Sequence, residues 1–241
     1  MAEAQQGPRA RYREQTRAEI KDAALRQLAD GGVAALALTR IAKDMGLSGP
    51  ALYRYFASRD DLLNALIRDA YDDAATAMGV AAARSEAAAH SPRERLRALA
   101  AAYRSWAVGE PHRYLLIQGS PVPGYVAPAD TLERARAVLG PFLPVFAGGV
   151  PGAGVAPVVA QMAAWLGSDA GVGDWVTAYA TDTAGDPAAK ARALAGAVLA
   201  WSQLHGSVGL EVAGQFAGMG HEGDTLLAAQ TDMLADAFAL A

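Results

Sequence analysis

The segment ALTRIAKDMGLSGPALYRYF, residues 37–56, constrains the fold of this chain more than any other. Ile41 and Met45 are spaced as on the inner face of a short helix, and Gly46 follows where a turn is expected. Ser48 is a favourable N-cap residue for a second helix. The pattern predicts two short helices joined by a tight turn, a unit that can place its second helix in the major groove of DNA.

Helical periodicity continues through the rest of the chain, and no segment alternates β-branched and polar residues as a strand would. Glycine and proline mark the ends of the helical segments, among them Pro121, Pro123 and residues 148–152. Thr39 is expected to cap the first helix of the pair. The predicted fold class is all-α, with helices over residues 12–30, 39–45, 48–56, 59–78, 92–108, 112–119, 132–146, 155–166, 174–183, 187–216 and 224–240.

Charge divides the chain into a basic part and an acidic part. Through Arg59 there are ten Lys and Arg residues against six Asp and Glu, a net charge of +4, and the remainder carries −8. A basic N-terminus on an acidic body is typical of a nucleic-acid binder with a separate second domain. We therefore predict a disordered arm over residues 1–11, a DNA-binding domain over residues 12–58 and a larger helical domain over residues 59–241.

Composition excludes several kinds of site. The chain has 241 residues and no cysteine, so disulfides and thiolate metal sites are excluded, and a cytoplasmic location is the expectation. No apolar run is long enough to cross a bilayer, and the polar first residues do not resemble a secretion signal. The four histidines are widely separated, and no acid–base pair or nucleophile triad is recognisable. We predict no metal, no cofactor, no membrane association and no catalytic residues.

The residue types at the second helix suit contact with DNA. Gly49, Pro50 and Ala51 are small, so the N-terminal end of that helix can approach base edges closely. Arg54 is the best candidate for a guanine contact, and the hydroxyl groups of the neighbouring tyrosines can donate hydrogen bonds to phosphates. Thr39 and Arg40, at the start of the preceding helix, are expected over the DNA backbone.

The order and spacing of these residues resemble the TetR family of bacterial transcriptional regulators. The match includes Thr39, Gly46-Leu47-Ser48, Leu52-Tyr53, Tyr55-Phe56 and Ser58-Arg59, and it covers about residues 12–70. The resemblance implies a helix-turn-helix protein that binds double-stranded operator DNA. Its expected DNA-binding residues are Thr39, Arg40, Ser48, Gly49, Pro50, Ala51, Tyr53, Arg54, Tyr55 and Arg59.

The acidic remainder resembles the ligand-binding and dimerising domain of such regulators. Trp201 followed by His205-Gly206 is similar to the W…HG pattern of one TetR subgroup. Apolar residues recur every three or four positions along that helix, and the last helix adds another apolar face. Two such helices from each subunit are predicted to form a homodimer interface, with Leu194, Val198, Val208, Val212, Leu227, Leu234 and Phe238; the alternative is packing within one chain.

Aromatic, apolar and amide side chains of the second domain are candidates for a pocket that binds a small apolar or amphipathic ligand. They equally suit an ordinary core. The candidates are Tyr103, Trp106, Tyr114, Gln118, Met162, Trp165, Trp201 and His205.

The combined expectation is a dimeric repressor that a small-molecule effector releases from a pseudo-palindromic operator. Two alternatives stay open at the level of the sequence. One is a regulator that answers to a protein partner or has no ligand, and the other is a helical enzyme or carrier. Saturable, ligand-dependent thermal shifts would argue against a regulator without a ligand. Salt-dependent affinity for DNA would argue against an enzyme or carrier.

Overall fold

The computed structural model describes residues 7–119 and 127–241. Those residues form helices and connecting turns, without a β-strand among them, so the predicted all-α class is confirmed. They divide into two compact units, Met1–Ala70 with His112–Pro128 and Tyr71–Pro111 with Ala129–Ala241. The predicted breaks at Pro121 and Pro123, and the first six residues of the predicted arm, lie outside the described residues.

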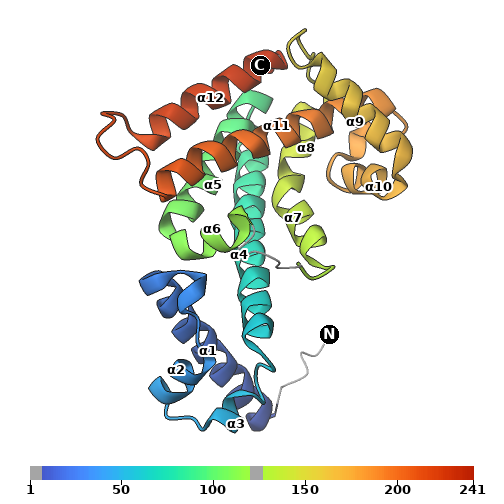
Figure 1. Ribbon diagram of the computed structural model, residues 1–241. Coiled ribbons are helices and arrows are strands. Elements are labelled where there is room, and N and C mark those ends of the chain that lie inside the picture. Colours follow the sequence, from blue (N-terminus) through green and yellow to red (C-terminus); the bar gives the residue numbers. More distant parts are fainter. Residues whose placement is uncertain (1–6, 120–126) are drawn as a thin grey trace. The chain divides into compact units, whose positions relative to one another are not determined.

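The first unit is built from α1 (Pro8–Gly31), a 3-10 turn (Val33–Ala35), α2 (Leu38–Asp44) and α3 (Gly49–Leu52), shown in blue in Figure 1. It also contains the beginning of α4 (Arg59–Ala87) and α6 (Pro111–Gln118). Its core includes aliphatic side chains and one phenylalanine that are at most 5 % exposed. They include Ile20, Ala24, Leu28, Ile41, Leu52, Phe56, Leu62 and Leu63.

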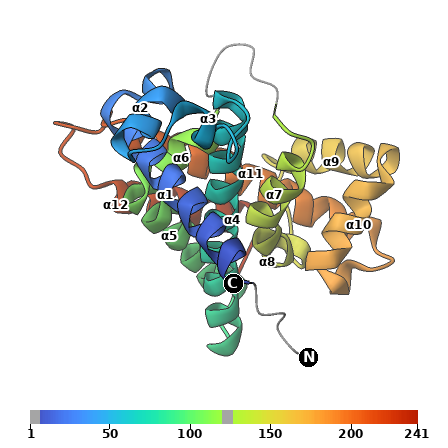
Figure 2. The ribbon, with the colours of Figure 1, turned by 90° about the horizontal axis from the view of Figure 1, so that it is seen from below.

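The second unit surrounds α11 (Pro187–Val212), which packs against α5 (Pro92–Gly109), α8 (Leu143–Ala147), α9 (Ala156–Ser168) and α12 (Gly223–Ala237). Figure 2 shows α9 beside α10 (Ala170–Tyr179), and these two helices are in contact. The unit is completed by the remainder of α4, by α7 (Thr131–Leu139) and by two 3-10 turns (Gly140–Phe142 and Thr181–Thr183).

Local residues explain where these helices begin. A reciprocal capping box starts α5, because Ser91 Oγ accepts from the Glu94 N–H (3.4 Å) and Glu94 Oε2 accepts from the Ser91 N–H (2.8 Å). Asp186 caps α11 by accepting from the N–H groups of Ala188 (2.9 Å) and Ala189 (3.0 Å). Ser58 and Asp61 start α4, where Ser58 Oγ accepts from the Asp61 N–H at 3.0 Å.

Several boundaries differ from the prediction. α1 begins at Pro8, four residues before the predicted start, because proline is favourable in the first turn of a helix. The single helix expected over residues 132–146 is divided by the 3-10 turn Gly140–Phe142. The chain passes from the first unit to the second within α4, after Ala70, whereas the predicted domain boundary lies at the start of that helix.

Candidate nucleic-acid interface

A tight turn orients α3 relative to α2. Gly46 adopts φ +65°, a conformation that side chains disfavour, and the Leu47 N–H donates to the Ala42 carbonyl at 2.8 Å. Ser48 Oγ then accepts from the Ala51 N–H at 3.3 Å, so the predicted cap of α3 is confirmed. The turn and the cap together determine the direction in which α3 leaves the turn.

The back of this helix pair is fixed in the core of the first unit. Ile41, Leu52 and Phe56 are at most 1 % exposed. The guanidinium of Arg17 on α1 donates to the Tyr55 carbonyl at 2.8 Å and lies 4.2 Å from the centre of the Phe56 ring. A rigid support of this kind reduces the entropy lost when the opposite face binds another molecule.

That opposite face carries most of the predicted DNA-binding residues. Tyr53 is 50 % exposed, and Arg54 beside it is also exposed. Four further predicted residues are exposed and three are half-buried, so the structure brings all nine to one helix pair and the turn that follows it. The exposed four are Thr39, Arg40, Ser48 and Pro50; the half-buried three are Gly49, Ala51 and Tyr55.

Two features of the pair differ from the prediction. Thr39 does not cap α2, because the helix begins at Leu38 and Ala37 is the N-cap residue. The Ala37 N–H donates to Gln27 Oε1 at 2.9 Å. The regular helix α3 ends at Leu52, whereas the prediction continues to residue 56. Hydrogen-bonded turns continue beyond it, with the Tyr55 N–H donating to the Leu52 carbonyl at 2.8 Å.

The structure gives Arg59 a role within the first unit. Its Nε donates to the Leu36 carbonyl at 3.0 Å and one terminal nitrogen donates to the Val33 carbonyl at 2.5 Å. The other terminal nitrogen lies 3.9 Å from the Asp60 carboxylate. Arg59 therefore ties the start of α4 to the segment before α2, and a phosphate contact would compete with these bonds.

The beginning of α1 adds residues that the sequence analysis did not select. Arg9, Tyr12 and Arg13 line a hollow of about 620 Å³ together with residues of the turn and α3, including Arg54. Tyr12 is 69 % exposed. The signal that could have identified them is the run of arginines at positions 9, 11 and 13. Together with Arg54, these side chains extend the basic surface beyond the helix pair.

Four of the predicted pocket residues form a packed cluster in the second unit. The Tyr103 ring centre lies 5.8 Å from that of Trp106, 5.6 Å from that of Trp201 and 5.9 Å from that of His205. Tyr103 Oη and His205 Nε2 are 3.3 Å apart, a hydrogen bond. Burial lowers the pKa of His205 to about 4, so the imidazole is neutral near pH 7. These rings fill the space between α5 and α11.

The other four predicted pocket residues are not part of this cluster. Tyr114, fully buried, and Gln118, exposed, belong to the first unit. Met162 is half-buried and Trp165 is 40 % exposed on α9. A single pocket containing all eight residues is therefore not a feature of either unit.

Most of the predicted dimer residues are buried by the chain's own helices. Leu194, Val208, Leu227, Leu234 and Phe238 are at most 4 % exposed. Val198 and Val212, which complete the predicted set, are half-buried. The five buried residues form part of the core between α11, α12 and their neighbours, which agrees with the alternative that this apolar stripe packs within one chain. A contact of these helices with a second chain stays a prediction.

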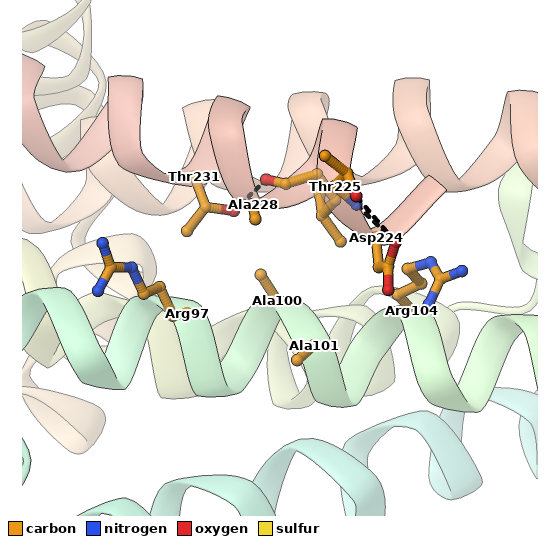
Figure 3. Close-up of a pocket in the computed structure, with 9 residues that line it drawn as sticks. Arg97, Ala100, Ala101, Arg104, Asp224, Thr225, Ala228 and Thr231 are labelled. Atoms are coloured by element: carbon orange, nitrogen blue, oxygen red, sulfur yellow. Dashed lines mark hydrogen bonds between the residues drawn. The ribbon is translucent and has the colours of Figure 1, made fainter. Parts of the chain in front are cut away.

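A hollow of about 620 Å³ lies between α5 and α12 (Figure 3). Its floor is made of small residues, among them Ala100, Ala101 and Ala228. Arg97 and Arg104 lie at its two ends in Figure 3, and each is bonded to a carboxylate: Arg97 Nε to Asp232 at 2.7 Å and Arg104 Nε to Glu211 at 2.8 Å. Ion pairs thus connect α5 to α12 and to α11.

Metal-binding clusters and membrane-spanning helices are absent from the described residues. Within residues 7–119 and 127–241, His, Cys, Asp and Glu side chains nowhere form a group of three that could hold a metal ion. Over the same ranges, no helix combines the length and the apolarity that crossing a membrane requires.

Comparison with known proteins identifies the family. Residues 20–66 match the family model for bacterial regulatory proteins of the tetR family, and residues 96–234 match a Tetracyclin repressor-like C-terminal domain. This chain belongs to the TetR family. The helix-turn-helix fold and the family predicted from the sequence are therefore confirmed for this transcriptional regulator.

Individual relatives agree with this TetR-family assignment. The HTH-type transcriptional regulator Rv1816 of Mycobacterium tuberculosis (strain ATCC 25618 / H37Rv) is 45 % identical over 145 residues. That match spans 60 % of this chain and 61 % of the relative, less than two thirds of its length. The solved structure of the regulatory protein SCO4313 is 41 % identical with a TM-score of 0.73, covering 95 % of this chain and 100 % of that one.

A more distant solved structure shows the fold alone. It is the transcriptional regulator FadR from Bacillus subtilis in complex with stearoyl-CoA, which is 14 % identical with a TM-score of 0.56. The match covers 91 % of this chain and 98 % of that one.

Proposed function

We propose that this TetR-family regulator binds an operator as a homodimer in the cytoplasm, represses transcription there, and leaves the operator when a small molecule binds its second unit. The observation that carries the DNA-binding part is the exposed Tyr53–Arg54 surface on a helix pair held rigid by the Phe56 core. The excess of four positive charges through Arg59 supports it, since phosphate attraction supplies much of the affinity for DNA.

The DNA-binding part is tested by single alanine substitutions. Tyr53→Ala and Arg54→Ala should each weaken binding to the promoter DNA upstream of the protein's own gene by about tenfold or more at moderate salt. Arg84→Ala removes an exposed arginine of the second unit and serves as the matched control. Fluorescence anisotropy measures the DNA affinity of all three variants. Unchanged DNA affinity of the Arg54→Ala variant would show that α3 is not the helix that contacts the bases.

The homodimer is supported by exposed small and apolar residues on the helices predicted to form it. On α11, Ser202, Gly206 and Leu210 are spaced four apart and exposed, and Leu210 is 48 % exposed. On α12, Met233 is 69 % exposed. A second copy that covers these faces would remove the apolar surface from water. The dimer would then present two helix-turn-helix units to the two half-sites of an operator.

The ligand-responsive part is supported by the fold and by the hollows of the second unit. The FadR neighbour binds stearoyl-CoA, so the same fold can hold a small molecule in that protein. The Trp201–His205 cluster, which resembles the W…HG subgroup, is packed ring against ring, so an effector there would have to displace a ring. α4 contributes residues to both units and is the proposed hinge. A ligand releases DNA only if it binds the non-DNA conformation more tightly.

A further inference from the structure

A second hollow in the second unit lies where α4, α5, α8 and α10 contribute side chains. Its volume is about 270 Å³, close to the lower end of the roughly 300–1,000 Å³ that is usual for ligand sites. The α4 side is formed by small residues, among them Gly79 and Ala82. A β-carbon added at Gly79 would meet no atom within 4 Å, so the space beside this helix face is open.

One polar side chain in the lining of this hollow lacks a hydrogen-bond partner among the described residues. Ser85 on α4 lines the hollow and is only 2 % exposed, yet its Oγ makes no hydrogen bond with the part of the chain that the structure describes. A serine inside a helix usually satisfies its hydroxyl with the carbonyl four residues earlier. Burying a hydroxyl without a hydrogen bond is unfavourable, so such a group calls for a partner from outside the chain.

Further donors face the same space. Arg95 lines the hollow, and its Nε donates to the His90 carbonyl at 3.0 Å, which fixes the side chain. Within the described residues no acceptor contacts the two terminal nitrogens of this guanidinium. Glu86 is the acidic residue of the lining, and it is exposed to solvent. The Ser85 hydroxyl and the terminal nitrogens of Arg95 are thus donors of the lining that no described residue of the chain satisfies.

The opposite wall carries the aliphatic side chain of Leu99 and the ring of Tyr179, which is 38 % exposed. Leu99 is 1 % exposed and closes the hollow from α5. Tyr179 closes it from α10, and its ring lies directly on Gly140, where an added β-carbon would be 2.3 Å from the ring carbon Cε1. Burial raises the pKa of the Tyr179 phenol, so its hydroxyl stays protonated and can donate.

We propose that this hollow binds a small molecule with an apolar body and one carboxylate or carbonyl oxygen. The oxygen accepts from Ser85 Oγ or from the terminal nitrogens of Arg95, and the apolar body lies against Leu99 and Tyr179. Binding at this site is a property of the free protein. It rests on the proposed function only if the ligand is also the effector that releases DNA.

Calorimetric titration of the free protein tests this site with two probes that share one ring system. 1-Naphthoate should bind saturably with a dissociation constant at or below about 1 mM. 1-Naphthylmethylammonium, which offers donors instead of an acceptor, should bind at least about tenfold more weakly. Equal binding of the two probes, or no saturable binding of naphthoate, would overturn the proposal.

Three variants of α4 locate the binding. Ser85→Ala should weaken naphthoate binding about three- to tenfold, because it removes one donor. Gly79→Leu should abolish it by filling the open space, and leucine also favours the helix, so folding is retained. Ala83→Leu is the matched control, because Ala83 is exposed on the same helix and does not line the hollow. Naphthoate binding to Gly79→Leu with wild-type affinity would refute this location.

These titrations contain no DNA. Loss of operator binding in the Arg54 variant and loss of naphthoate binding in the α4 variants are therefore separate results, and failure of one proposal is distinguishable from failure of the other. Naphthoate should also raise the melting temperature of the wild-type protein and leave that of Gly79→Leu unchanged.

Discussion

At the scale of single residues, two arginines that look equivalent in the sequence have different surroundings. Arg59 donates to the carbonyls of Leu36 and Val33 and is half-buried, whereas Arg40 is exposed at the start of α2. From the sequence, Arg40 is expected over the DNA backbone because of its position, and Arg59 because of the family resemblance. The structure therefore separates a residue that holds the first unit together from one whose side chain is available to a partner.

Replacing these arginines should affect different measurements. Arg59→Ala should lower the free energy of unfolding by about 1–2 kcal/mol, because two charge-assisted hydrogen bonds are lost from a partly exposed site. Arg40→Ala should change stability by less than about 0.5 kcal/mol but weaken DNA binding. Urea denaturation and anisotropy measure the two effects. A stable Arg59→Ala protein with weak DNA binding would support the phosphate contact that the family resemblance implies.

His205 should make stability depend on pH. Burial lowers the pKa of its imidazole to about 4 in the folded state, against 6.5 in the unfolded chain. The unfolded state therefore binds more protons between these values, so stability is highest above about pH 6.5 and falls as the pH decreases towards 4. The loss by pH 5 should be about 2 kcal/mol.

Urea denaturation at pH 5 and pH 8 checks this expectation. His205→Gln should flatten the dependence, because the amide does not titrate, whereas His221→Gln should leave it intact, since His221 is exposed. An unchanged pH dependence in His205→Gln would assign the effect to another group.

At the scale of elements, close approach between helices depends on single glycines. Gly196 on α11 is buried, and an added β-carbon would lie 2.0 Å from Phe146 Cγ of α8. The Phe146 ring in turn contacts Phe238 edge to face, with ring centres 5.0 Å apart. The missing side chain at residue 196 is therefore what allows α8 to pack against α11.

Gly196→Ala should lower the free energy of unfolding by about 1–3 kcal/mol, since the extra methyl group forces Phe146 or the α8 backbone to move. Gly167→Ala on α9 is the control, because a β-carbon there meets nothing within 4 Å. That change should be neutral or stabilising by up to about 1 kcal/mol. Thermal and urea denaturation distinguish the two, and equal effects would show that the α8–α11 contact tolerates a larger separation.

At the scale of the whole molecule, two features bear on assembly: most of the predicted dimer residues are already buried within one chain, and other apolar residues on α11 and α12 are exposed. If the proposed homodimer uses those exposed residues, a charge placed there should be desolvated on association and should weaken the dimer. The same charge on an unrelated exposed surface should have no such effect.

Leu210→Asp and Met233→Asp should each raise the dimer dissociation constant by at least about tenfold, or 1.4 kcal/mol. Leu132→Asp is the matched control, because Leu132 on α7 is 60 % exposed. Sedimentation equilibrium at micromolar concentration measures the three variants, and promoter binding should weaken with loss of the dimer. A wild-type chain that sediments as a monomer would exclude the homodimer itself.

The sequence by itself determined the helical class, the helix pair with its Ser48 cap, and the family. These features depend on contacts between residues close in the chain, such as helical spacing, capping side chains and glycine turns, and the family match depends on their order. The extension of α3 by about one turn and the Thr39 cap were predicted incorrectly because the Ala37–Gln27 hydrogen bond and the Phe56 core, both made with distant residues, decide those ends.

Only the tertiary structure decided what the apolar and aromatic residues of the second unit do. A stripe along α11 looks the same in the sequence whether a second chain or the same chain covers it, and here α5, α8, α9 and α12 pack against that helix. Tyr103 and Trp201 became a packed cluster, while the hollow beside Ser85 is formed by residues whose types carry no signal of a site. Burial depends on which segments meet in space, and local spacing does not specify that.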